Sequence, residues 1–397
     1  MATNQQPEMK QSRLARVKER NKKIKQVSIA LGLLIVMIGG LFVLRMLGFY
    51  KSIQTEAQTN KPKKEDIHTH NFLLLGYGGG NHAGAFLTDT IMLAHVDTKK
   101  KKILLISIPR DIWVEVPTKD DTFHSKINAV YQMGLFPENY PALDPKFHSN
   151  SNPSGYINYV VKNLAGLEVD GYVAVDFEGF VQTVGELGGI DVAVEKEFYD
   201  YEYPITGKED DVCDLEGDQL EEALRIATTS SVLEAFPCRF ETLHFVAGTT
   251  HMDGEEALKF ARSRHSLQDG GDFNRTRRQQ LVLEAMKEKV LQIGFIPKII
   301  PLLDQLETHI STDIPLADLQ SLLLEARNAK QYSVETFVVG EDYLSSDYSN
   351  EGQYITIPKV GLDDWSEVKL VIHQIIEGIT PTPTPSLTSS PSPTSTP

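Results

Sequence analysis

Cysteine is nearly absent from this chain: Cys213 and Cys238 are the only two among 397 residues. Two cysteines without paired histidines nearby do not indicate a zinc site. The sequence also lacks the Gly-x-Ser-x-Gly elbow of serine hydrolases. Its glycine-rich stretch from Tyr77 to Ala83 lacks the Gly-Lys-Ser/Thr ending of a nucleotide P-loop. With no short internal period, a repeat array is not indicated either.

Positive charge is in the minority, with 39 basic against 54 acidic residues and a net charge of −15. Because so acidic a surface repels phosphates, no nucleic-acid partner is expected, although local basic clusters can still bind anions. The basic residues are unevenly placed. Eight of them and only two acidic residues precede residue 27, giving +6, while the remaining 31 basic and 52 acidic residues give −21.

One long run has no charge at all, from Val27 to Leu44, and Met46 to Tyr50 extends it. This length predicts a transmembrane helix over residues 27–49. The basic residues of segment 1–26 hold that end in the cytoplasm, so we expect a single-pass signal-anchor protein with its main domain outside. The alternatives are a cleaved signal peptide, whose apolar core is usually shorter, and a buried soluble helix, which nothing nearby could cover.

The rest of the chain divides by composition. Residues 50–66 are polar and predict a stalk, residues 67–379 an extracytoplasmic domain, and residues 380–397 a disordered Pro/Ser/Thr-rich tail. An outside location permits a Cys213–Cys238 disulfide, which would close a loop of about 25 residues and stabilise it by about 3 kcal/mol. Two free buried thiols are the alternative.

Apolar patterning predicts an α/β fold for the outer domain. Strands are expected at residues 71–75, 90–96, 103–108, 172–175, 190–194 and 336–339, with a hairpin turn at residues 97–100. Helices are expected at residues 177–187, 254–262, 274–291, 316–329 and 365–376. Alternating strands and helices indicate a mixed central β-sheet covered by helices on both faces, a three-layer α/β/α domain.

The segment from Lys259 to Gln280 carries most of the candidate chemistry. Arg262 and Arg264 end one helix, and Asp272 or Asn274 can cap the next. Arginines in the first turns of a helix oppose its dipole, unless an anion binds there. By spacing, Arg275, Arg278 and Gln279 can share one face of that helix. A solvated basic face paired with surface carboxylates is the alternative.

Three shorter motifs lie near the ends of predicted elements. Arg110 and Asp111 follow a buried strand, Asp89 precedes another, and Lys126 begins a short helix. The alternatives to a functional role are a structural ion pair for Arg110 and Asp111 and a turn cap for Asp89. The histidines at 82, 124, 244, 251 and 265 show no nucleophile–base arrangement.

In this order the motifs resemble those of the LytR-CpsA-Psr family, over about residues 70 to 295. Each motif alone is weak, but six in order behind a membrane span are specific. They are LLLG at 73–76, TDTIML at 88–93, SIPRD at 107–111, KINAVY at 126–131, VDFEGF at 175–180 and the block at 262–280.

The resemblance implies a bacterial enzyme of cell-wall biogenesis that moves an anionic glycopolymer from a polyprenyl-pyrophosphate carrier to peptidoglycan. It implies a pyrophosphate-binding set of Arg110, Arg262, Arg264, Arg275 and Gln279, with Lys126 at a further basic position. Arg278 is grouped with this set because it is expected on the same helix face. Asp89 matches an acidic metal-site position for Mg²⁺ or Mn²⁺. Phosphoryl transfer relies on such positioning and charge neutralisation, and Asp89 or Asp111 is the candidate base for the attacking hydroxyl.

One departure from the family pattern stands out. Many members have a second metal-site aspartate soon after the LLLG strand, but residues 77–83 contain no carboxylate. Two alternative functions therefore stay open. One is hydrolysis of the same lipid, and the other is a wall-binding or regulatory membrane protein that retains the fold without turnover.

Overall fold

The computed structural model describes residues 40, 43–55, 68–80, 84–148, 152–290, 306–326 and 331–380. The basic segment 1–26, most of the expected span 27–49, most of the expected stalk and residues 381–397 lie outside this set. Among the residues described, no helix is both long and apolar enough to cross a bilayer. The described residues cover most of the expected outer domain and the helix that leads into it.

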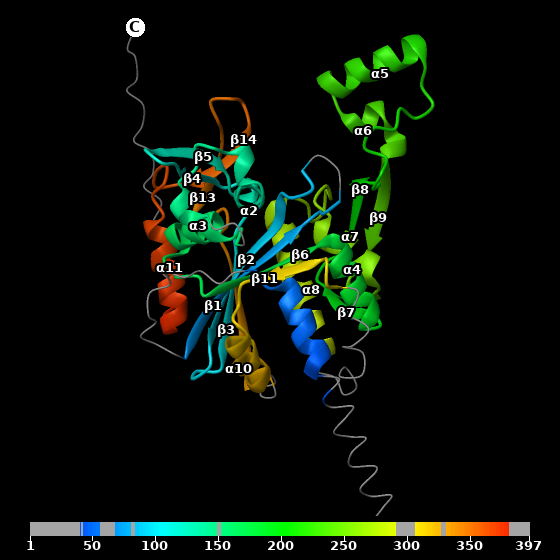
Figure 1. The fold of residues 1–397 in the computed structure, drawn as a ribbon. Coiled ribbons are helices and arrows are strands. Elements are labelled where there is room, and N and C mark those ends of the chain that lie inside the picture. Colours follow the sequence, from blue (N-terminus) through cyan, green and yellow to red (C-terminus); the bar gives the residue numbers. More distant parts are fainter. Residues whose placement is uncertain are drawn as a thin grey trace, which may run out of the picture.

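A six-stranded mixed sheet lies at the centre of the domain, as the sequence predicts (Figure 1). Strands β1 and β6 are parallel, as are β3 and β12, while β1–β2, β2–β3 and β6–β11 are antiparallel. In spatial order the strands are β11 (Ile310–Thr312), β6 (Gly171–Asp176), β1 (Thr69–Tyr77), β2 (Thr88–Asp97), β3 (Lys102–Ser107) and β12 (Ser333–Val338).

The expected hairpin joins β2 to β3. Asp97 fixes its turn, because one carboxylate oxygen accepts hydrogen bonds from the backbone N–H groups of Lys99 and Lys100 at 2.9 and 2.7 Å. An aspartate that accepts backbone hydrogen bonds in this way stabilises a turn in place of a helix or strand.

One face of the sheet is covered by a filled core. Leu73 and Leu75 on β1 and Leu104 and Ile106 on β3 occupy alternate positions, so they point to the same side and are buried there. They pack with the helices α2 (Val130–Leu135), α3 (Gly155–Ala165) and α11 (Ser366–Glu377). Figure 1 shows α3 and α11 on this side of the sheet.

The opposite face is covered by α4 (Phe177–Glu186), α7 (Gly254–Arg262) and α8 (Asp272–Val290), so helices lie on both faces as predicted (Figure 1). These helices form a second, separate core with two small ribbons. The ribbons are β7 (Ile190–Val194) with β10 (Gly248–Met252), and β8 (Phe198–Pro204) with β9 (Phe240–Phe245).

The remaining elements are peripheral. Two further ribbons pair β4 (Trp113–Pro117) with β5 (Thr122–Lys126), and β13 (Leu344–Tyr348) with β14 (Tyr354–Pro358). Helix α10 spans Leu316–Ala326. Short 3₁₀ helices are η1 (Ile127–Ala129), η2 (Pro137–Asn139), η3 (Pro145–Phe147) and η4 (Pro237–Arg239).

Helical residues 43–53 lead into the domain and dock at the end of β11. The Tyr50 hydroxyl donates to the Ile314 carbonyl at 3.1 Å, and the Thr55 N–H donates to the Thr312 carbonyl at 2.8 Å. Ile53 is buried. The first residues of the expected stalk are therefore part of the folded domain.

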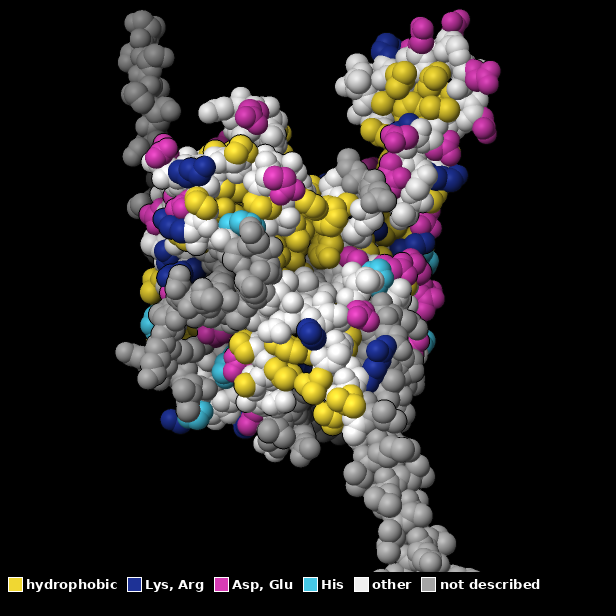
Figure 2. Space-filling view, viewed as in Figure 1, with side chains coloured by type: hydrophobic (Ala, Val, Ile, Leu, Met, Phe, Trp, Pro, Cys, Tyr) yellow, Lys and Arg dark blue, Asp and Glu magenta, His cyan; other side chains and the backbone are white. Residues whose placement is uncertain are grey.

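Between β8 and β9 the chain forms a protruding insert with α5 (Gly217–Thr229) and α6 (Val232–Ala235) (Figure 1). Cys213 and Cys238 are joined by a disulfide, and Ala223, Ala235 and Phe236 form a small core of its own. Figure 2 shows it as a separate lobe with acidic side chains around an apolar patch.

Because this small core is separate from the two large ones, the disulfide should stabilise the insert locally. We expect the double substitution Cys213→Ser/Cys238→Ser to raise the rate of backbone amide exchange within residues 205–239 by more than tenfold. A disulfide that closes a loop of this length stabilises the folded insert by about 3 kcal/mol, and the substitution removes that stabilisation. Hydrogen-exchange mass spectrometry measures this. Equal acceleration in the β1–β3 strands would contradict a local role.

Candidate functional site

A cavity of about 510 Å³ separates the second face of the central sheet from α4, α7 and α8. Most of its walls are apolar, with side chains supplied by both the sheet and the covering helices. Examples are Leu74, Val175, Phe180, Leu258, Val282 and Met286. The sheet therefore has one face against a filled core and the other against a space that an apolar chain can enter.

Polar groups from distant parts of the sequence also line this cavity. Four arginines take part, together with Gln279 and the carboxylates Asp89, Asp176 and Asp200. The arginines are Arg110, Arg262, Arg264 and Arg275. All the arginines that the family resemblance assigns to a pyrophosphate thus line one cavity. Lys126, Asp111 and Arg278 are not among the lining residues.

Arg110 lies between two carboxylates at the end of β3. One guanidinium nitrogen donates to Asp89, and Nε lies 3.5 Å from Asp111 Oδ2. Lys126 Nζ donates to the other oxygen of Asp111 at 2.6 Å. Burial raises the pKa of Asp111, but the hydrogen bond from Lys126 and the charges of Arg110, Lys126 and Arg275 together hold it below its ordinary value. Asp111 and Lys126 therefore form a charged support behind Arg110.

Arg262 ends α7, where a positive charge is favoured by the helix dipole. Its guanidinium lies 4.5 Å from the centre of the Phe177 ring and 5.6 Å from that of Tyr203. One nitrogen donates to the Tyr203 hydroxyl at 3.2 Å. These aromatic contacts fix the side chain at the cavity wall without neutralising its charge.

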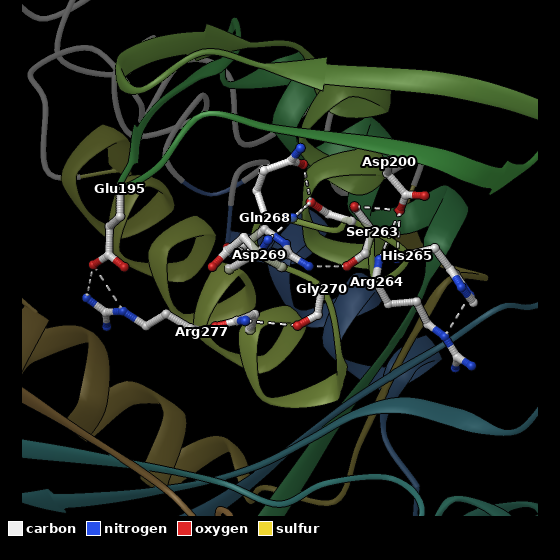
Figure 3. A network of polar contacts seen from close by, with 12 residues as sticks. Glu195, Asp200, Ser263, Arg264, His265, Gln268, Asp269, Gly270 and Arg277 are labelled. Carbon is white, nitrogen blue, oxygen red and sulfur yellow. Dashed lines mark hydrogen bonds and ion pairs between the residues drawn. The ribbon is translucent and has the colours of Figure 1, made fainter.

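Asp200 organises the loop that carries Arg264, a role that the sequence analysis missed. One carboxylate oxygen accepts from Ser263 Oγ at 2.6 Å and from the backbone N–H groups of Arg264 and His265 at 3.0 and 3.2 Å (Figure 3). Burial raises the pKa of Asp200, but these hydrogen bonds lower it below its ordinary value. The sequence contained one indication of this role. Asp200 lies two residues after Phe198 on β8, so both side chains point to the buried side of the strand.

The start of α8 presents Arg275 and Gln279 to the cavity. Arg275 is buried, and its charge reaches Asp111. On the same helix, the Gln280 amide donates to Ser107 Oγ at 2.9 Å, which ties α8 to the end of β3 beside Arg110. Asn274 donates its side-chain N–H to the Gly270 carbonyl at 2.9 Å.

Arg278, which the helix spacing predicts on the same face as Arg275 and Gln279, points elsewhere. Its side chain is 2% exposed and donates to both the carbonyl and the carboxylate of Asp269, at 2.8 and 2.9 Å, and to the Ser263 carbonyl. Burial lowers the pKa of Arg278, and the charges of Asp269 and Asp200 oppose that change. The structure therefore gives Arg278 a part in holding the α7–α8 loop and not in lining the cavity.

Asp176, a second carboxylate that the sequence analysis passed over, lines the cavity next to the glycine-rich loop. It caps α4 by accepting from the Gly179 N–H at 2.8 Å and pairs with His309 Nδ1 at 2.8 Å. A Cβ added at Gly79 would lie 3.0 Å from the Asp176 Cβ. Where that loop lacks its own carboxylate, Asp176 from β6 lies directly against it. The VDFEGF motif, which contains Asp176, was the available signal.

Comparison with known proteins identifies the same family that the sequence motifs resemble. A model of the LytR_cpsA_psr family matches residues 45–367. The chain is 28% identical over 231 residues to TagV of Bacillus subtilis, named a polyisoprenyl-teichoic acid–peptidoglycan teichoic acid transferase, covering 58% of this chain and 46% of TagV. It is 27% identical over 340 residues to TagU of Halalkalibacterium halodurans, which has the same activity name, covering 80% and 90%.

Other relatives and solved structures extend the comparison. The regulatory protein MsrR of Staphylococcus aureus is 25% identical over 306 residues, covering 76% of this chain and 74% of MsrR. The crystal structure of B. subtilis TagV superposes with a TM-score of 0.51 at 23% identity, over 80% of this chain and all of that one. TagT bound to LIIa-WTA gives 0.51 at 20% identity, over 82% and 97%. These structural similarities show that the chain shares the fold of TagV and TagT.

The neighbours Arg277 and Arg278 allow a matched test of the loop. Arg278→Ala should lower the free energy of unfolding by about 3 kcal/mol, because it leaves the Asp269 charge and the Ser263 carbonyl without their buried donor. Arg277 is 39% exposed and pairs with Glu195 on the surface, so Arg277→Ala should cost under about 1 kcal/mol (Figure 3). Urea unfolding measures both. Equal losses would contradict the assignment.

Asp200 predicts a dependence of stability on pH. Because its folded pKa lies below that of the unfolded chain, the carboxylate stabilises the fold above about pH 4, and this contribution is lost as pH falls through the folded pKa. Asp200→Asn should therefore be less stable at pH 7 by about 2 kcal/mol, with the difference shrinking at acidic pH. Urea unfolding from pH 7 to 3, with exposed Asp210→Asn as control, tests this. A difference that is constant with pH would refute it.

Proposed function

Because the chain belongs to the LytR-CpsA-Psr family, we propose that it is a membrane-anchored phosphotransferase that attaches an anionic glycopolymer from a polyprenyl-pyrophosphate carrier to peptidoglycan. The observation that carries this proposal is the cavity, which is lined both by apolar side chains and by four arginines. A polyprenyl diphosphate has the complementary composition, with a long apolar chain joined to a compact anion. The names of the TagV and TagU relatives support this substrate class.

The arginines would act on the charge of the diphosphate. Planar guanidinium groups donate pairs of hydrogen bonds to phosphate oxygens and remain charged throughout. An acceptor sugar hydroxyl attacks the phosphorus next to the glycan. The new P–O bond forms as the bond to polyprenyl phosphate breaks, and the hydroxyl proton passes to a base. Arg110, Arg262, Arg264 and Arg275 stabilise the charge that gathers on the departing phosphate.

Asp89 is the residue that fits a divalent cation at this site. Its carboxylate lines the cavity and is 25% exposed, and hard oxygen donors suit Mg²⁺ or Mn²⁺. Among the described residues, no three imidazole, thiolate or carboxylate groups converge there, so phosphate oxygens and water would complete the shell. A bound ion would neutralise phosphate charge. Asp89 is also the better candidate base, because Asp111 lies behind Arg110 with its pKa lowered by Lys126.

Anchorage is the second part of the proposal. The uncharged run within residues 27–49 is the expected span, and residues 43–53 connect it to the domain as a helix that docks at β11. The basic segment 1–26 would remain cytoplasmic, placing the cavity near the outer leaflet, where a lipid carrier presents its diphosphate.

Two alternatives remain distinct in chemistry. With water as the acceptor, the same site would be a polyprenyl-pyrophosphate hydrolase. The name of MsrR, a regulatory protein, favours instead a wall-binding or regulatory role without turnover. The cationic lining argues against simple adhesion, since clustering four arginines has an electrostatic cost that a diphosphate ligand would offset.

The proposal predicts Mg²⁺-dependent transfer from a short-chain polyprenyl-pyrophosphate saccharide to peptidoglycan fragments by the full chain in detergent. Arg110→Ala and Asp89→Asn should each lower the rate at least about hundredfold. Arg110→Ala removes a positive charge at the phosphate directly, and Asp89→Asn weakens the hold on the divalent ion that would supply another. The surface variant Arg277→Ala should retain the wild-type rate. Mass spectrometry of the glycan product, linked through phosphate, provides the measurement.

The other outcomes separate the alternatives. Release of phosphate without a glycan product would indicate the hydrolase. Tight binding of the lipid that survives chelation of Mg²⁺ and the Asp89→Asn substitution, without any turnover, would indicate a binding protein and would overturn the transferase proposal.

A further inference from the structure

A second group of potential metal ligands lies on the β4–β5 ribbon, away from the cavity. Glu115 on β4 and His124 on β5 are direct partners in the antiparallel register, so their side chains share one face. Asp363, just before α11, brings a second carboxylate to the same point. One ligand atom from each of the three residues lies within 4.8 Å of the others, and none of the three lines the cavity.

Neighbouring groups hold these side chains in place. His124 Nε2 lies 2.9 Å from Asp363 Oδ2, and the imidazole stacks on the Trp113 ring with 6.1 Å between centres and 13° between planes. The Thr122 hydroxyl donates to one oxygen of Glu115 at 3.1 Å. The Trp113 ring and the Thr122 hydroxyl lie outside the three-residue group, and metal ligands in proteins are commonly oriented by outer partners of this kind.

The charge of the cluster is unbalanced. Two carboxylates approach one imidazole, and Asp363 Oδ1 is fully buried without accepting a hydrogen bond. A buried carboxylate oxygen without a donor is costly, because it has lost its water and gained no partner. A protonated His124 would offset only one of the two negative charges. A divalent cation would offset both.

We propose that Glu115, His124 and Asp363 bind a divalent transition-metal ion of the Zn²⁺ class. One imidazole nitrogen and two carboxylate oxygens form a three-ligand set that leaves a fourth position for water. Ca²⁺ and Mg²⁺ prefer oxygen ligands alone, so the imidazole favours Zn²⁺ over them.

The site would join three segments that are separate in sequence. The ion would tie the loop before α11 to both strands of the ribbon. Lys126 follows His124 by two residues on the same face of β5, and it donates to Asp111 behind Arg110. The site therefore stabilises the ribbon that positions Lys126. This inference does not depend on the proposed transferase activity.

Metal binding can be measured apart from the cavity by using the full chain in detergent with Asp89→Asn. We expect this protein, stripped of metal, to bind one equivalent of Zn²⁺ by calorimetry and by metal analysis after dialysis. Adding Zn²⁺ should raise its melting temperature, because the ion binds the folded state. Glu115→Gln and His124→Gln, each in the same background, should weaken Zn²⁺ binding at least tenfold and abolish the rise.

His251→Gln is the matched control. His251 pairs with Asp191 at 2.8 Å on the surface, and among the described residues no third ligand joins that pair. This variant should bind Zn²⁺ as its parent does. Should His124→Gln fail to fold, as judged by circular dichroism, Glu115→Gln decides alone, since Glu115 is exposed. No stoichiometric binding in the parent, or binding unchanged by Glu115→Gln, would overturn the proposal.

Discussion

Repulsion among clustered arginines is the constraint on which the candidate site depends. Four guanidinium groups line one cavity, and like charges repel most strongly where water is scarce. The fold offsets this by placing carboxylates at fixed positions around them. Asp89 and Asp111 flank Arg110, and Asp200 fixes the backbone that carries Arg264. The arrangement stays open to an external anion, because these carboxylates neutralise only part of the positive charge.

The two faces of the sheet pack differently, and this difference leaves room for the apolar part of the site. One face meets a continuous core with α2, α3 and α11. The helices on the other face pack mainly with the small ribbons, and between them and the sheet a cavity remains. Interiors are normally close-packed, so a large apolar space is a feature that the covering elements must maintain.

Apolar periodicity predicted much of the fold. The expected helix at 254–262 has the bounds of α7, and the expected strands at 90–96 and 103–108 correspond to β2 and β3. These elements bury regular apolar stripes, so local pattern and tertiary packing agree. The separate second core was not predictable, because pairing between β7 and β10 or β8 and β9 joins segments that are remote in sequence.

The ordered motifs predicted which residues come together at the cavity, whereas the direction of the Arg278 side chain was not predicted. Arg275, Arg278 and Gln279 were grouped by spacing, but the consecutive positions 278 and 279 point about 100° apart around a helix. Arg275 and Gln279 therefore face the cavity while Arg278 turns to Asp269. Asp200 carries no motif and acts through backbone N–H groups, which only the folded loop brings to it.

The central claim is that one cavity recognises an apolar chain and a diphosphate together. The most direct measurement is the affinity of the full chain for a short-chain polyprenyl diphosphate, compared with the matching prenyl alcohol and with inorganic diphosphate. The account predicts that the joined ligand binds at least about tenfold more tightly than either part, which corresponds to about 1.4 kcal/mol. Equal affinity for inorganic diphosphate and the lipid would mean that the apolar walls do not contribute, and would contradict the account.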